Sequence, residues 1–154
     1  MNQLILDVQG IVHPNSSKTH ISYQFHLGSH VGKLRIHFAY EPKNLEDREI
    51  SKSMILKSIH KYTEPNQSER LQAKWESFLP LKNLITLSVD DPERHRGAGH
   101  RHDPEQLLVI SELEASPGFI SGKLPAGLWN VTLSLHAIVT ESCRYTMHIH
   151  QEEA

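Results

Sequence analysis

Residues 129–139 read WNVTLSLHAIV and contain the longest run of alternating apolar and polar side chains in the chain. Successive side chains of a β-strand point to opposite faces, so a strict alternation predicts a strand with one buried and one solvated face. The side chains expected to share the buried face are Trp129, Val131, Leu133, Leu135, Ala137 and Val139. This stretch indicates a half-buried sheet as the basic unit of the fold.

Working outward, the same alternation recurs in 20–27, 33–40, 83–89 and 143–150, and we also expect strands at 4–12 and 106–113. Turn residues separate most of these segments, and no repeat of fixed period joins them. The pattern predicts a mainly β fold, an antiparallel β-sandwich of about seven to nine strands. A length of 154 residues fits a single domain over residues 1–154.

The alternation stops over residues 44–80, which we expect to be a helical insertion after the third strand. In SERLQAKWESFL, residues 68–79, the apolar positions Leu71, Trp75, Phe78 and Leu79 fall on one helical stripe. We therefore expect a helix at roughly 67–79. Asn44 is a candidate N-cap for an earlier helix, with Asp47 three residues on as a partial capping box.

Composition narrows the classes of function. The formal net charge is −2, so no strong field draws the chain to nucleic acid or to an anionic membrane. We expect neither partner. One cysteine excludes an internal disulfide, and no secretion signal is visible at the N-terminus, so we expect a cytoplasmic location.

Residues 91–105, DPERHRGAGHRHDPE, form a polar stretch whose side chains could bind a metal ion or another ligand. His95, His100, His102 and Asp103 are possible zinc ligands, but the neighbouring arginines would repel a cation. An anion or a carbohydrate fits the loop 93–103 better, because glycine N–H groups and guanidinium groups bind phosphate well. The residues expected to bind such a ligand are Arg94, Arg96, Gly97, His100 and Arg101. The simplest interpretation is a polar loop between strands.

A second candidate is a small metal-dependent hydrolase. His148 and His150 alternate on the last strand and share one face, and His136 lies on the outward face of the preceding strand. Cys143 has no evident base, and no G-x-S-x-G elbow is present. We therefore favour a protein with no catalytic residues, no metal and no cofactor, and keep His136, His148 and His150 as the metal-site alternative.

The second half of the chain carries a more specific pattern. Asp91–Pro92 and Arg96–Gly97 precede the LLVIS strand, SPGF follows at 116–119, and LPAGLW at 124–129 opens the long strand. This order resembles the accessory β-sandwich that precedes the catalytic domain in PHP-type (polymerase and histidinol phosphatase) metal-dependent phosphoesterases. The likeness covers about residues 84–150. On this resemblance, Arg96 ties the loop down by bonding carbonyls or a carboxylate rather than binding a ligand.

The resemblance implies a fold and not an activity. In such proteins an Asp-x-His-x-His motif starts the metal site after the sandwich, whereas MHIHQ at 147–151 lacks the aspartate. We expect a non-catalytic binding or interaction domain whose partner is a PHP-type hydrolase or a second copy of itself. Exposed edge strands and the helical insertion are the expected contact surfaces.

Overall fold

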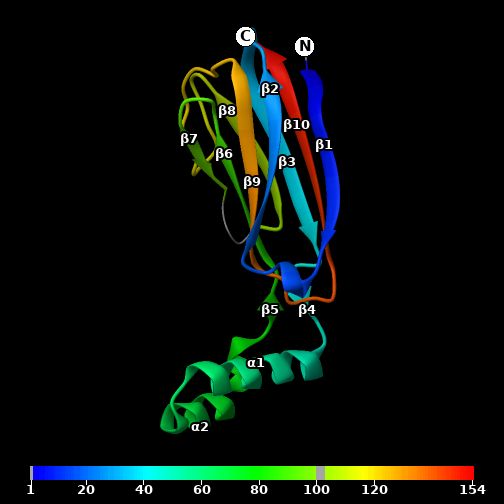
Figure 1. Ribbon diagram of the computed structural model, residues 1–154, viewed down its shortest axis with the longest axis vertical. Helices are drawn as coiled ribbons and strands as arrows, with labels where there is room; N and C mark the ends of the chain where they lie inside the picture. The colour runs from blue at the N-terminus through cyan, green and yellow to red at the C-terminus, as the bar shows by residue number, and fades with distance from the viewer. Residues whose placement is uncertain (1, 100–102) are drawn as a thin grey trace.

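The computed structural model describes residues 2–99 and 103–154 and confirms the mainly β fold (Figure 1). Two four-stranded sheets pack face to face, and all neighbouring strands are antiparallel. The first sheet has the order β1 (Asn2–Val12), β10 (Cys143–Glu153), β3 (Val31–Glu41) and β8 (Glu105–Ser111). The second has the order β2 (Thr19–Leu27), β9 (Gly127–Ala137), β6 (Leu84–Asp90) and β7 (His95–Ala98). A short 3-10 helix, η1 (Pro14–Ser16), links β1 to β2.

The core lies between the sheets and is built from the inward positions of the alternating strands. Val131, Leu133 and Leu135 of β9 are almost fully buried, as the sequence predicted. Trp129 stacks on Phe25 with ring centroids 6.1 Å apart and donates its indole N–H to the Pro125 carbonyl at 2.8 Å. A buried aromatic ring with its one polar atom satisfied stabilises the core without a desolvation penalty.

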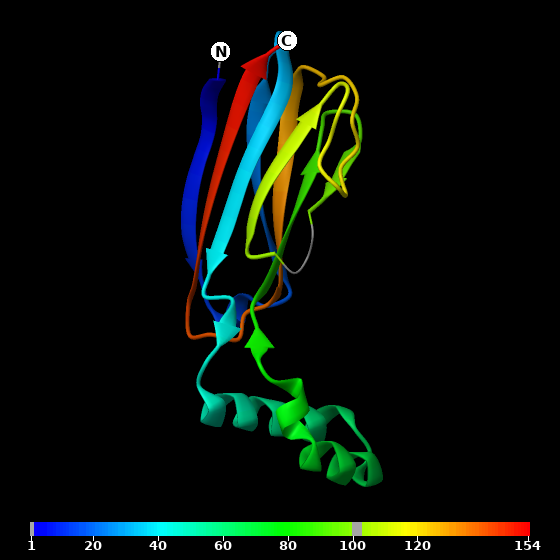
Figure 2. The same cartoon turned by 180° about the vertical axis from the view of Figure 1, so that it is seen from behind.

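The helical insertion stands away from the sandwich as an arm (Figures 1 and 2). A two-stranded ribbon, β4 (Asn44–Leu45) with β5 (Leu81–Lys82), forms its stalk. The arm contains α1 (Arg48–Tyr62), α2 (Pro65–Ala73) and the 3-10 helix η2 (Trp75–Phe78). None of the described helices is long and apolar enough to cross a membrane.

Two details of the insertion differ from the sequence-based expectation. The predicted helix over 67–79 is divided, because α2 ends at Ala73 and Trp75–Phe78 form a separate 3-10 turn. Asn44 lies in the stalk and does not cap a helix, whereas the carboxylate of Asp47 caps α1 by accepting the Ile50 N–H at 2.9 Å. Both residue types are good N-caps, so type alone did not identify the helix start.

Asn83 fastens the stalk to the base of the sandwich. Its buried amide group donates to the Pro42 carbonyl and to Thr140 Oγ1, both at 2.8 Å. Its carbonyl oxygen accepts the Val139 N–H at 2.7 Å. The strand β9 ends at Ala137, two residues before the predicted end of the strand at Val139.

Candidate functional site

Arg96, an expected ligand-binding residue, is a buried tie within the fold. Its side chain is 0% exposed and lies over the Trp129 ring, with 5.5 Å from the guanidinium carbon to the ring centroid. The guanidinium donates to Asp91 Oδ2 at 3.0 Å and to three carbonyls of the connection that follows β8, those of Ile120, Gly122 and Lys123, at 2.9–3.1 Å. This is the arrangement that the resemblance implied for Arg96, and it leaves the guanidinium inaccessible to a ligand.

Asp91 is the carboxylate partner of Arg96 and also closes the turn before β7. Its Oδ1 accepts the backbone N–H groups of Glu93 at 2.6 Å and Arg94 at 2.7 Å. Burial alone would raise the pKa of this carboxyl, but these hydrogen bonds and the Arg96 guanidinium outweigh that effect. The pKa of Asp91 therefore lies below its ordinary value, and the pair stays ionised inside the fold.

Gly97, another expected ligand-binding residue, is packed against the backbone of Gly118 and Phe119. Its φ of +122° lies in a region that favours glycine, and a Cβ added there would lie 2.1 Å from the Gly118 carbonyl oxygen. Gly97 forms a bridge with Phe119, so two backbones meet at this position. Glycine is required at position 97 because these two backbone segments approach too closely for a side chain.

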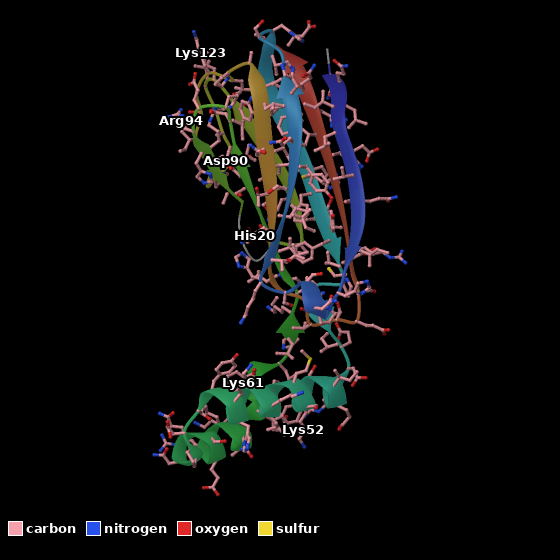
Figure 3. All side chains as sticks on the ribbon, in the orientation of Figure 1. His20, Lys52, Lys61, Asp90, Arg94 and Lys123 are labelled. Carbon is pink, nitrogen blue, oxygen red and sulfur yellow. The ribbon has the colours of Figure 1, made fainter. Side chains whose placement is uncertain are left out.

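Of the remaining expected ligand-binding residues, Arg94 is the one that the structure describes. Arg94 is exposed at the end of the sandwich, where Figure 3 shows it near Lys123. His100 and Arg101 lie outside the described residues. An anion- or carbohydrate-binding role for the loop stays a prediction that rests on Arg94, His100 and Arg101.

Residues 112–126 cover the edge of the sandwich formed by β7 and β8, which we call the covered edge. Against β7, the connection makes the Gly97–Phe119 bridge, and Ile120 N–H donates to the Arg96 carbonyl at 2.8 Å. Against β8, Ala115 bridges Ile110, and Ser116 N–H donates to the Val109 carbonyl at 2.9 Å. One segment thus pairs with edge strands of both sheets.

The opposite side, formed by β1 and β2, is the open edge. Within the described residues, β1 pairs only with β10, and β2 pairs only with β9. Leu4 and Ile11 of β1 are 46% and 55% exposed. Behind them, five incompletely buried apolar side chains pack against the core: Ile5, Leu6, Val8, Ile21 and Tyr23. Unpaired backbone groups and apolar side chains therefore lie together at this edge.

A hydrogen bond between two tyrosines closes the middle of the open edge. The hydroxyl groups of Tyr23 on β2 and Tyr145 on β10 are 2.6 Å apart. Burial is the main cause that raises the pKa of Tyr145, and the contact with Tyr23 adds to it. Gly10 makes room for the Tyr145 ring, because a Cβ there would lie 2.5 Å from it.

The three histidines of the hydrolase alternative do not meet. His136 lies on the outer face of the second sheet, where its Nε2 is 2.8 Å from Thr86 Oγ1. His148 and His150 lie on the outer face of the first sheet, on the far side of the core. The proximity that this alternative required is absent, because β9 and β10 belong to different sheets. Within the described residues, no group of three or more His, Cys, Asp or Glu side chains is arranged to hold a metal ion.

Cys143 is buried at the start of β10. Burial is the main cause that raises the pKa of its thiol to about 11. A thiol that stays protonated at neutral pH is a poor nucleophile. Cys143 is therefore a core side chain.

Sequence reasoning missed His37, which lies directly opposite His148 on the outer face of the first sheet. The imidazole centroids are 6.0 Å apart. His37 alternates with buried residues in 33–40, so its outward direction was predictable. Its partner was not, because the pairing of β3 with β10 joins segments more than a hundred residues apart.

The arm carries an apolar groove of about 320 Å³ where it meets the sandwich. Met54, Ile59 and Phe78 line it from the arm, and Val139 lines it from the sandwich. The aromatic face of Trp75 is covered by Arg48 and Lys52, at 4.9 and 5.3 Å from the ring centroid. Lys52 and Lys61 extend from α1 in Figure 3.

Comparisons with known proteins give only distant likenesses. No family model matches the chain, and no curated protein matches it significantly. A protein from Sulfurospirillum deleyianum is 8% identical, with a TM-score of 0.32, over 94% of this chain and 97% of that one. A CBM36 domain of a xylanase from the hindgut metagenome of Trinervitermes trinervoides is 8% identical, with a TM-score of 0.36, over 96% and 98%. The carbohydrate-binding module TmCBM61, in complex with β-1,4-galactotriose, is 14% identical, with a TM-score of 0.35, over 94% and 82%. These low similarities do not assign the chain to a family.

Proposed function

We propose that this chain is a non-catalytic interaction domain that associates through its open edge. The observation that carries the proposal is the unpaired outer edge of β1, eleven residues long, beside incompletely buried apolar side chains. Exposed edge strands of this length template the addition of another strand unless charge, proline or a covering segment protects them. The resemblance to the accessory domain of PHP-type phosphoesterases supports the non-catalytic part of the proposal.

The occupant we propose is β1 of a second copy of this chain. Antiparallel pairing of two identical strands about a two-fold axis gives each copy the same contacts, as in most homodimers. β1 contains one charged side chain, Asp7, and no proline, so little in the strand opposes such pairing. A strand supplied by a PHP-type hydrolase is the competing occupant.

Light scattering coupled to gel filtration tests this assignment on the full chain. We expect a dimer that dissociates on dilution, and a monomer at every concentration for the double variant Leu4→Lys, Gln9→Lys. Both side chains point outward from the edge strand, and lysine there is a common protection against strand addition. The matched control is Leu107→Lys on β8, which is 74% exposed at the covered edge and should remain dimeric.

Two results would contradict the proposal. A wild-type chain that is monomeric at all concentrations would overturn self-association and favour a strand from another protein. A dimer that survives the double substitution but dissociates after a change in the arm would move the interface away from the open edge.

A further inference from the structure

His37 and His148 lie directly opposite each other on the outer face of the first sheet, and each of them contacts a carboxylate. Asp7 on β1 is paired with His148 on β10, whereas Glu105 on β8 is paired with Ala39 and lies diagonally from His37, whose own partner on β8 is Leu107. His148 Nε2 lies 3.1 Å from Asp7 Oδ1, and His37 Nε2 lies 3.0 Å from Glu105 Oε1. Each imidazole thus has a carboxylate on the side away from the other imidazole.

The positions of the two carboxylates determine which nitrogen of each imidazole remains available to bind a ligand. His37 is hydrogen-bonded to Glu105 through Nε2, and Nε2 is also the nitrogen of His148 that contacts Asp7. A neutral imidazole that carries its proton on Nε2 keeps its lone pair on Nδ1. Nδ1 and Nε2 point to roughly opposite sides of an imidazole ring, so each Nδ1 faces away from the carboxylate that its Nε2 contacts. No hydrogen bond or ion pair joins either Nδ1 to another part of the chain that the structure describes.

We propose that His37 and His148 bind one divalent transition-metal ion, such as Zn²⁺ or Cu²⁺, through their Nδ1 atoms. Zinc–imidazole bonds of about 2.0–2.1 Å place the centres of two rings on one ion roughly 5 to 6.5 Å apart. The observed separation of 6.0 Å, with the rings tilted by 50°, fits this range. Asp7 and Glu105 then act as the carboxylates that orient metal-binding histidines in many proteins.

The surroundings leave room for the rest of the coordination sphere. The neighbouring row carries the small side chains Thr146 and Ala39, which border a hollow of about 830 Å³ on this face. Water fills the remaining positions, because the protein supplies two ligands. On the other side, the cation Arg35 is held by Glu152 at 2.8 Å, which limits its repulsion of a metal ion.

Calorimetric titration of ZnCl₂ into the untagged full chain tests the proposal. We expect one ion per chain, and at least a tenfold loss of affinity in both His37→Gln and His148→Gln. His20→Gln is the control, since His20 lies on the outer face of the second sheet, 2.9 Å from Ser134 Oγ. Repeating the titration with the wild-type chain at a concentration where it is monomeric separates metal binding from association, because the site needs only one copy.

Cu²⁺ spectroscopy provides a second readout that a folding defect would not mimic. Electron paramagnetic resonance should show nitrogen coordination that disappears in His37→Gln, while circular dichroism of the variant stays unchanged. Asp7→Asn should weaken zinc binding by about 10- to 100-fold, the usual cost of removing such a carboxylate. Zinc binding that is absent in the wild type, or that is unchanged in both histidine variants, would overturn the proposal.

Discussion

The covered edge and the open edge end the same two sheets in different ways. At the covered edge, residues 112–126 satisfy the backbone of β7 and of the second half of β8, and Arg96 binds three of their carbonyls from within. At the open edge, no such segment from residues 2–99 or 103–154 pairs with β1 or β2, and a tyrosine pair bridges the sheets. Unprotected edge strands invite pairing with another strand, so the difference between the two edges supports the proposed association through the open edge.

The two edges also differ in the forces that hold them. The covered edge depends on a buried ion pair, which costs desolvation and is stable only when every hydrogen bond is made. The open edge depends on apolar packing and on a hydrogen bond between neutral hydroxyl groups. Substitutions should therefore have large effects on stability at the covered edge, and small effects at the open edge.

Arg96→Ala should have the largest effect. It removes four hydrogen bonds and leaves the Asp91 carboxylate buried without its cation, which costs about 3–5 kcal/mol in comparable buried pairs. Urea unfolding of the variant measures the loss. Arg94→Ala, at an exposed neighbour, should change stability by no more than about 0.5 kcal/mol. Equal effects of the two substitutions would refute the structural role of Arg96.

Asp91→Asn should destabilise less, and in a pH-dependent way. The pKa of Asp91 is lowered in the folded chain, below an unfolded value of about 3.9. Its ionisation therefore stabilises the fold above about pH 4, and this contribution is lost as the pH falls through the folded pKa. The difference in free energy of unfolding between wild type and Asp91→Asn should shrink in acid. A difference independent of pH would show that the charge is unimportant.

Gly97→Ala should cost about 1–3 kcal/mol, because alanine is strained at a φ of +122° and its Cβ would meet the Gly118 carbonyl. Thermal unfolding checks the change. Gly28→Ala is a suitable control, since the side chain of His30, which is free to move, is the nearest group there. If the two glycines tolerate alanine equally, the close approach of the connection to β7 is not maintained in solution.

Tyr145→Phe should have the smallest effect, about 0.5–1.5 kcal/mol for the loss of one hydrogen bond between hydroxyl groups. Tyr23→Phe removes the same bond and should give a similar value. The double variant should cost little more than either single variant, because the interaction is shared. Additive losses in chemical denaturation would mean that the two hydroxyl groups do not bind each other.

Much of this architecture follows from local patterns in the sequence. Alternation in 20–27, 33–40 and 129–137 predicted strands with the correct faces inward, because each strand has one buried side. The resemblance implied the tie made by Arg96. The sandwich and the helical insertion are both confirmed by the structure.

What the sequence did not show depends on pairing between distant segments. β9 and β10 are consecutive strands, so the metal-site alternative placed His136 near His148, but the chain changes sheets between them. Because β10 joins the first sheet between β1 and β3, His148 lies beside His37 and β1 is left at the edge of the sheet. Alternation gives the direction of a side chain from its strand, and it carries no information on which strand lies beside it.

Hydrogen exchange at increasing protein concentration tests the difference between the edges most directly. In dilute solution, amides on the outer side of β1 should exchange rapidly, while amides of β7 and of 112–126 that bond across the covered edge exchange slowly. At high concentration, β1 should become protected and the covered edge should not change. Protection of β1 that is independent of concentration, or that appears instead in α1 and α2, would contradict association through the open edge.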